Sequence, residues 1–177
     1  ERHKPNLTDH LIIVGYGVNG KNLALSAKAA NIPYIILEMN VDTVKREKAL
    51  GEPIFFGDAS NEEVLIFAGI KSARIIVVAI NDITAVRRIT SNIKALNPAI
   101  HSIIRTRHVN EMEMLYKLGA SEVIPEEFET SVEIFTRVLS KYLVSQNQIT
   151  EFVDRIRTSG YHMFRSLSPE TNSFPGI

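Results

Sequence analysis

A G-x-G-x-x-G pattern occupies residues 15–20, directly after the apolar run 11–14. Its glycines meet separate requirements of a bound pyrophosphate. Gly15 permits a tight turn from strand to helix, Gly17 lets the backbone approach the phosphates, and Gly20 lets the helix pack close to the sheet. The N-terminus of the following helix offers free N–H groups and a partial positive charge. The pattern predicts a phosphate-binding turn, and an ordinary glycine-rich turn of an α/β fold is the simpler alternative.

An acidic residue at a suitable distance sharpens this prediction. Glu38 ends a second apolar run, 34–37, and lies 18 residues after Gly20. At this spacing, the carboxylate can accept hydrogen bonds from both hydroxyls of an adenosine ribose. Its charge repels a 2′-phosphate, so the sequence favours NAD(H), AMP or ADP over NADP. The alternative is that Glu38 is a solvated loop acid.

These residues need a scaffold, and apolar runs alternate with helical patterns along residues 11–125. Strands are predicted at 11–15, 34–38, 54–56, 75–79, 101–105 and 122–124. Helices are predicted at 18–30, 41–49, 61–68, 82–96 and 109–117. Runs such as 75–79 are apolar throughout, which is typical of parallel strands buried on both faces. This order predicts an α/β fold, a Rossmann-like doubly wound parallel sheet of about six strands.

The pattern changes after Pro125, where one long helix is predicted at 126–146 and a shorter amphipathic one at 148–159. The apolar face of the long helix consists of Phe128, Val132, Phe135, Val138, Leu139, Tyr142 and Leu143. The apolar faces of two helices that follow a completed sheet must be buried against another surface, and a second copy of the chain is the simplest such surface. The alternative is that both helices pack on their own sheet. The predicted domains are a nucleotide-binding domain at 9–125, dimerisation helices at 126–160 and a loose tail at 161–177.

Composition narrows the function classes. The 20 basic and 20 acidic residues balance, which argues against nucleic acid or an anionic membrane surface as the main partner. The absence of cysteine excludes disulfides, thiolate metal sites and cysteine nucleophiles. No apolar run is long enough to span a bilayer.

Several segments together resemble one known family. Besides the glycine turn and Glu38, these are Gly57-Asp58-Ala59-Ser60 and Ala68-Gly69-Ile70. They resemble an RCK domain, also called a KTN or TrkA-N domain, which is the nucleotide-binding regulator of potassium channels and transporters. The resemblance spans residues 9–146. The segment Leu118–Glu127 is similar to the end of this domain in Kef-type monovalent cation/proton antiporters.

The resemblance implies a regulatory domain on the cytoplasmic side of the cell membrane, on the same polypeptide as a membrane transporter. Helix 126–146 would cross to the partner of a homodimer. The lack of a methionine before Glu1 agrees with a piece of a longer protein. The alternatives are an NAD-dependent oxidoreductase and a stand-alone peripheral regulatory subunit of a potassium channel.

The resemblance also implies a set of cofactor-binding residues at the carboxyl ends of strands. The pyrophosphate would lie on the glycine turn, the ribose on Glu38, and the adenine near Asp58 and Ala59, while Arg105 reaches phosphate. The full expected set is Gly15, Tyr16, Gly17, Val18, Asn19, Gly20, Glu38, Met39, Asn40, Asp58, Ala59, Ala79, Ile80 and Arg105.

Some of these residues have simpler explanations. Asp58 and Asp82 each precede a helical pattern and are candidates for N-caps. Of Arg105 and Arg107, one can pair with an acid across a dimer interface instead of contacting a ligand. The five histidines show no metal-site spacing, and neither H-E-x-x-H nor G-x-S-x-G occurs. We therefore expect no catalytic residue and no metal site.

Overall fold

The computed structural model describes residues 7–165, which divide into two compact units. The first unit, residues up to 106 together with 110–124, contains a six-stranded sheet of order β3-β2-β1-β4-β5-β6. The strands are β1 (Leu11–Val14), β2 (Tyr34–Glu38), β3 (Ile54–Phe56), β4 (Ile75–Val78), β5 (His101–Thr106) and β6 (Glu122–Pro125). Adjacent strands from β3 to β5 are parallel. The predicted doubly wound parallel sheet is confirmed.

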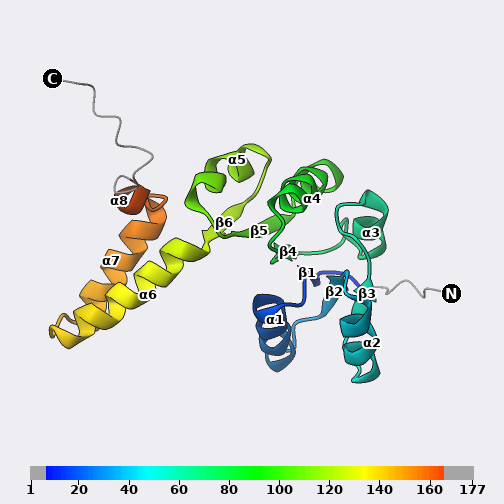
Figure 1. The fold of residues 1–177 in the computed structure, drawn as a ribbon, viewed down its shortest axis with the longest axis horizontal. Coiled ribbons are helices and arrows are strands. Elements are labelled where there is room, and N and C mark those ends of the chain that lie inside the picture. Colours follow the sequence, from blue (N-terminus) through cyan, green and yellow to red (C-terminus); the bar gives the residue numbers. More distant parts are fainter. Residues whose placement is uncertain (1–6, 166–177) are drawn as a thin grey trace. The chain divides into compact units, whose positions relative to one another are not determined.

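Helices cover both faces of this sheet. They are α1 (Val18–Ala29), α2 (Val41–Ala49), α3 (Glu62–Phe67), α4 (Ile83–Leu96), the 3₁₀ helix η1 (Val109–Glu111) and α5 (Met112–Lys117). Figure 1 shows α1 and α2 on one side of the sheet and α3, α4 and α5 on the other. In the strand order, the chain moves outward from β1 through β2 to β3 on one side and from β4 through β5 to β6 on the other. This reversal lies between β1 and β4, and ligands of open α/β sheets bind in the crevice at such a point.

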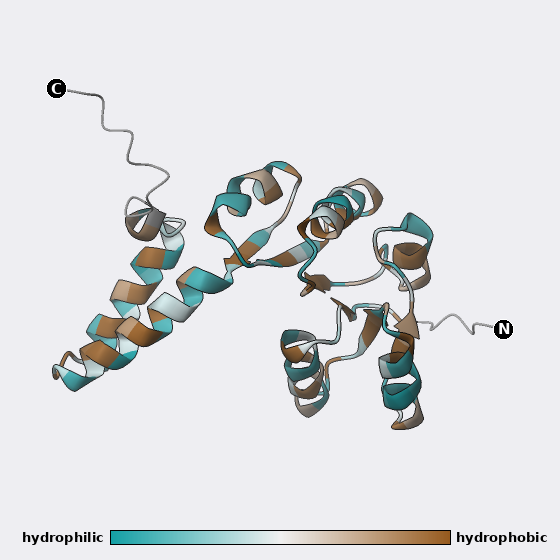
Figure 2. Cartoon of the chain, in the orientation of Figure 1, coloured by the Kyte–Doolittle hydropathy of each residue, from teal (hydrophilic) through white to brown (hydrophobic). Residues whose placement is uncertain are grey.

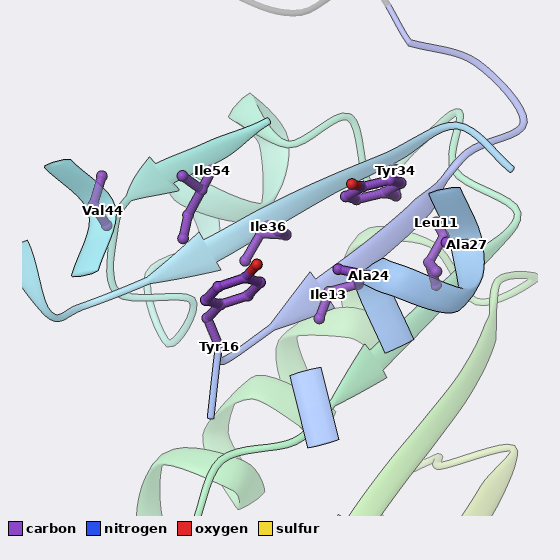
Figure 3. Close-up of a cluster of buried hydrophobic side chains, with 9 residues drawn as sticks. All are labelled: Leu11, Ile13, Tyr16, Ala24, Ala27, Tyr34, Ile36, Val44 and Ile54. Carbon is purple, nitrogen blue, oxygen red and sulfur yellow. The ribbon is translucent and has the colours of Figure 1, made fainter. Parts of the chain in front are cut away.

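The core follows from the apolar strands. Every residue of β1 is buried, and so are the first four of β2. Side chains of α1 and α2 complete a cluster on one face of the sheet (Figure 3); its members are Leu11, Ile13, Tyr16, Ala24, Ala27, Tyr34, Ile36, Val44 and Ile54. This packing fixes the ends of β1 and β2, from which the glycine turn and Glu38 begin.

Local signals at the helix ends agree with the structure. Asp82 caps α4, because its Oδ1 atom accepts hydrogen bonds from the N–H groups of Thr84 and Ala85. Gly69 and Gly119 follow helices with φ angles of +78° and +104°. Glycine adopts such angles without steric cost, so both residues can end their helices in this conformation.

The described part of the second unit, residues 107–109 and 125–165, is mainly helical. It contains α6 (Glu126–Lys141), α7 (Gln146–Thr158) and α8 (His162–Arg165). The predicted long helix therefore ends five residues early, because Leu143 adopts a left-handed φ of +59° that breaks the helix. Ser145 then starts α7 through a capping box with Gln148. That Ser-x-x-Gln signal was present in the sequence but not recognised.

The apolar faces of α6 and α7 pack against each other in part. Val132 and Ile149 are buried, and the rings of Phe135 and Phe152 lie 5.4 Å apart. Figure 2 shows alternating hydrophobic and polar bands along both helices. Tyr142 and Leu143 were expected on the apolar face, but they follow the end of α6 and are exposed.

Residues 161–165, which were predicted to begin a loose tail, are structured. Tyr161 is buried, and residues 162–165 form α8. The rings of Tyr161 and Phe164 both pack on Phe128 of α6, at centroid distances of 5.5 and 5.2 Å. The rest of the predicted tail, residues 166–177, lies outside the described residues. No helix between residues 7 and 165 is long and apolar enough to cross a membrane.

Candidate functional site

The loops that follow the first four strands lie next to one another. The N–H of Gly15 donates to Leu37 O at 2.9 Å, and the N–H of Ala79 donates to Val14 O at 2.9 Å. The N–H of Gly57 donates to Glu38 O at 3.1 Å. We call the loops 15–20, 38–40, 57–60 and 79–81 the carboxyl edge. The edge brings together most of the residues that the sequence singled out.

The three glycines of the first loop have different surroundings. A Cβ on Gly15, which has a φ of +96°, would lie 2.7 Å from a methyl group of Ile80. A Cβ on Gly20 would lie 2.0 Å from Gly15 O, so α1 packs directly on the turn. Around Gly17, a Cβ would meet no atom within 4 Å. The backbone at Gly17 is therefore open to an incoming group, as a pyrophosphate requires.

The first turn of α1 carries no side-chain cap. Gly17 occupies the N-cap position, no side chain bonds the free amides, and no acidic residue lies in the first turn. Val18 and Asn19 are exposed there. Uncapped N–H groups at a helix N-terminus provide hydrogen-bond donors and a positive potential for an anion.

Tyr16 points away from this turn. Its ring belongs to the buried core cluster beneath the carboxyl edge (Figure 3), and burial raises the pKa of its phenol. Only the backbone of Tyr16 faces the site, where its N–H donates to Glu38 Oε2 at 2.8 Å. The side chain thus anchors the loop in the core.

Glu38 lies at the centre of the carboxyl edge. Its Oε1 atom accepts hydrogen bonds from the N–H groups of Met39 at 2.8 Å and Asn40 at 2.7 Å, in addition to the bond from Tyr16 to Oε2. Because a carboxylate accepts about four hydrogen bonds, this arrangement leaves room for about one more donor on Oε2. The carboxylate is therefore oriented by two loops and is not a freely solvated loop acid.

The side chains of the next two residues of this loop differ in whether they are already bonded within the protein. Met39 is 60% exposed, whereas the Oδ1 atom of Asn40 caps α2 by accepting from Thr43 N at 2.9 Å. The amide oxygen of Asn40 is therefore occupied by the cap. Met39 therefore carries an exposed apolar side chain directly after Glu38 in the chain.

The loop after β3 is shaped by Asp58. Its Oδ1 atom accepts from Ser60 N at 2.8 Å, and the cap of α3 is Asn61 instead. The interpretation of Asp58 as a helix cap is therefore wrong, because the N-cap is Asn61 and α3 begins at Glu62. Asp58 is exposed, whereas Ala59 is buried and offers only its backbone.

A cavity of about 630 Å³ adjoins this loop. Its lining is polar and comes from the Asp58 loop, the start of α3, and α4; the residues are Asp58, Ser60, Asn61, Glu62, Glu63, Arg88 and Asn92. Asn92 crosses from α4 to the loop, where its Nδ2 atom donates to Ser60 O at 2.9 Å. Sequence reasoning missed Asn92, because a residue 32 positions from its partner leaves no local signal.

Ala79, Ile80 and Arg105 complete the expected set. Ala79 and Ile80 directly follow β4, and Ile80 contacts the glycine turn as described above. Arg105 lies near the end of β5 and donates through Nη1 to the side-chain oxygen of Asn81. Arg105 therefore lies one strand beyond the β1–β4 switch. The strand ends at Thr106, so Arg107 lies outside β5.

The histidines take part in local contacts. His10 is buried and bonds Ala68 O through Nε2 at 2.8 Å, and His101 pairs with Glu122. His108 pairs with Glu127. Among residues 7–165, no three His, Cys, Asp or Glu side chains are grouped so that they could hold a metal ion.

A parallel sheet whose glycine turn and following acid meet beside the topological switch defines a Rossmann-type domain. A family model of the TrkA-N domain matches residues 11–126, well over half of the chain. The chain belongs to the TrkA-N domain family.

Curated relatives include potassium efflux antiporters. The putative K(+) efflux antiporter KefB of Alkalimonas amylolytica is 29% identical over 165 residues, covering 93% of this chain and 25% of that protein. K(+) efflux antiporter 1, chloroplastic, of Arabidopsis thaliana is 30% identical over 158 residues, covering 89% and 13%. The chain thus spans a quarter or less of the length of these relatives.

Solved structures share the fold. The TrkA-N domain of the inner membrane protein ybaL from Escherichia coli has a TM-score of 0.70 and 26% identity, covering 79% of this chain and all of that one. The Shewanella denitrificans Kef CTD in its AMP-bound form has a TM-score of 0.71 and 21% identity, covering 89% and 96%. The GsuK channel bound to NAD has a TM-score of 0.63 and 20% identity, covering 78% and 23%.

Proposed function

We propose that this chain is a regulatory domain that binds an adenine nucleotide, NAD(H), AMP or ADP, at the carboxyl edge. The pyrophosphate or phosphate binds the glycine turn and the first turn of α1, and the ribose binds Glu38 with Met39 and Asn40 beside it. The adenine lies near Asp58 and Ala59. Ala79, Ile80 and Arg105 line the far side of the site. No residue is assigned a catalytic role.

One observation carries this proposal. The Glu38 carboxylate is held by three backbone amides from two loops, next to the open backbone of Gly17. A preoriented acceptor beside an uncapped helix N-terminus suits a ribose joined to a phosphate. The NAD-bound and AMP-bound states of the GsuK and Kef structures support the same ligand class.

The bound nucleotide gates an attached potassium transporter or cation/proton antiporter. The relatives are K(+) efflux antiporters of which a chain like this is a minor part, which supports a membrane portion on the same polypeptide. The domain then lies on the cytoplasmic side of the membrane. Gating requires different affinities of the nucleotide for two conformations, and a coupling free energy of about 1–3 kcal/mol is ordinary for such a switch.

The homodimer forms through residues 126–146. In α6, Ile134 is 60% exposed and Val138 is 43% exposed. The contact of α6 with α7 therefore leaves a second apolar stripe uncovered on α6. A second copy of the same helix is a partner of matching chemistry.

Isothermal titration calorimetry with AMP, ADP, NADH and NADPH tests the nucleotide assignment. We expect binding of one or more of the first three ligands and much weaker binding of NADPH, because its 2′-phosphate meets the Glu38 carboxylate. Tight binding of NADPH without NADH would contradict the role of Glu38. Absence of binding by all four nucleotides would contradict the proposed function itself.

A further inference from the structure

We propose that Asn92 of α4 is a positioning residue that sets the orientation of the Asp58 carboxylate and thereby the preference of the site for adenine over other purines. This inference rests on the proposed nucleotide site. It assigns a role to a residue outside all four loops of the carboxyl edge.

A short chain of hydrogen bonds joins the two side chains. Asn92 Nδ2 donates to Ser60 O at 2.9 Å, and Ser60 N donates to Asp58 Oδ1 at 2.8 Å. The N–H of Asn61 donates to Asp58 O at 3.0 Å and closes the turn. Asn92 therefore fixes the peptide group that follows Ser60, and Ser60 fixes the carboxylate of Asp58.

Asp58 lies where the orientation of its carboxylate can affect the binding of a base. Asp58 is exposed, and it lines the 630 Å³ cavity together with Asn92. The loop that carries Asp58 is joined to Glu38 by the bond from Gly57 N to Glu38 O. A base attached to a ribose at Glu38 thus comes within reach of the Asp58 carboxylate.

The chemistry of a carboxylate then selects the base. With Oδ1 held by Ser60 N, Asp58 Oδ2 accepts the exocyclic 6-amino group of adenine. Hypoxanthine and guanine carry a carbonyl oxygen at the same position, and two acceptors facing each other are repulsive. Selectivity depends on the direction of Oδ2, because hydrogen bonds weaken steeply as their angle departs from linearity.

The test compares AMP with inosine monophosphate (IMP), which has a 6-oxo group in place of the 6-amino group and an N1–H in place of the unprotonated N1. Calorimetry is carried out on the wild type, Asn92→Ala and Asp58→Ala. We expect the wild type to prefer AMP, and Asp58→Ala to lose most of that preference. Asn92→Ala should lower the AMP-to-IMP affinity ratio about fivefold, through weaker AMP binding, because the loss of a neutral hydrogen bond such as that from Asn92 to Ser60 O changes an equilibrium by roughly this factor.

A matched control is available on the same helix end. Asn97 also donates from Nδ2 to a backbone carbonyl, Ile70 O, at 2.9 Å, but Ile70 follows α3 and lies outside the Asp58 turn. Asn97→Ala removes a bond of the same kind, together with the bond from Ala99 N to Asn97 Oδ1, and should leave the AMP-to-IMP ratio unchanged. Asn92→Leu, which keeps a similar bulk and raises the helix propensity but lacks the donor, repeats the test if Asn92→Ala folds poorly.

A double-mutant cycle separates positioning from direct contact. If Asn92 acts through Asp58, Asn92→Ala has no further effect on the ratio in an Asp58→Ala background. An additive effect, or an unchanged ratio in Asn92→Ala, overturns the role of Asn92 while the proposed nucleotide site stands. Failure of the wild type to bind AMP or any other adenine nucleotide overturns both.

Discussion

At the residue scale, Glu38 has a structural role as well as a proposed binding role. Its two oxygens satisfy the backbone amides of Tyr16, Met39 and Asn40. These amides belong to the loops after β1 and β2, so the carboxylate ties together two loops that carry separate parts of the ligand. A neutral amide cannot replace it, because an amide presents an N–H₂ group where one of the backbone donors points.

We therefore expect Glu38→Gln to lose both stability and nucleotide binding. At least one backbone N–H loses its charged acceptor, which costs about 1–2 kcal/mol for a group that is partly exposed. Urea denaturation followed by circular dichroism measures the loss. Glu151→Gln, at an exposed position of α7, serves as the control and should leave stability unchanged. Equal stability of Glu38→Gln and the wild type would contradict the tie between the two loops.

At the element scale, two glycines at the junction of β1 and α1 have different roles, one in folding and one in ligand binding. A methyl group at Gly20 would overlap Gly15 O at 2.0 Å, whereas a methyl group at Gly17 meets nothing within 4 Å. The two glycines therefore have different reasons to be present. Gly20 is required for α1 to pack against the turn, and Gly17 keeps the backbone open to a ligand.

The matched pair Gly17→Ala and Gly20→Ala tests this division. Gly20→Ala forces the turn and helix apart, and we expect a loss of about 1–3 kcal/mol in the free energy of unfolding. Gly17→Ala should cost less than about 1 kcal/mol, the difference between glycine and alanine at an N-cap. It should nevertheless weaken AMP binding more than tenfold, because the methyl group occupies the space of the phosphate. Full AMP affinity in Gly17→Ala would place the phosphate elsewhere.

The pairing of α6 with α7 depends on an ion pair. Glu129 accepts two hydrogen bonds from Arg157, at 2.7 and 3.0 Å, and one from Tyr161. The bonds from Arg157 first, and that from Tyr161 second, hold the pKa of Glu129 below its ordinary value of 4.5. A lowered pKa in the folded state adds stability above the unfolded pKa, and this contribution is lost as the pH falls through the folded value.

Glu129→Gln should therefore destabilise the protein at pH 7 by about 1 kcal/mol, since the pair is partly exposed. The difference between variant and wild type should shrink as the pH is lowered from about 5 towards 3. Urea denaturation at a series of pH values follows this difference. Glu133 pairs with the highly exposed Arg137 on the same helix, so Glu133→Gln should show almost no effect. A difference that grows on acidification would contradict the assigned ion pair.

At the scale of the whole molecule, α6 presents an apolar stripe that α7 does not cover. Ile134 is more exposed than Phe135, whose ring contacts that of Phe152 of α7 in a tilted arrangement. A regulatory domain that transmits ligand binding to a transporter needs a second surface whose contacts change when the nucleotide binds. A dimer through α6 provides such a surface, and its existence is a separate question from nucleotide binding.

Light scattering of the isolated chain tests the dimer. We expect a dimer at micromolar concentration, and a monomer for the double variant Ile134→Glu/Val138→Glu, because two buried charges on each copy oppose association. Ser140→Glu lies on another side of α6 and should remain dimeric. A wild-type monomer under the same conditions would rule out this interface.

The sequence by itself determined most of the sheet. Uninterrupted apolar runs such as Leu11–Val14 can be buried on both faces only in a covered parallel sheet, and glycines such as Gly69 and Gly119 mark the ends of helices through their backbone freedom. The glycine turn and Glu38 were identifiable because their spacing along the chain reflects one strand, one helix and the next strand. These are local properties, and local properties can be read from a single sequence.

Only the tertiary structure decided how the side chains are used. The break at Leu143 and the buried Tyr161 depend on the packing of α6, α7 and α8 rather than on helical periodicity. The partner of Asn92 lies 32 residues away. The hydrogen bonds of Glu38 arise because strand pairing places two loop ends within 3 Å of one carboxylate. Contacts between residues distant in the chain depend on the folded geometry, which spacing alone does not specify.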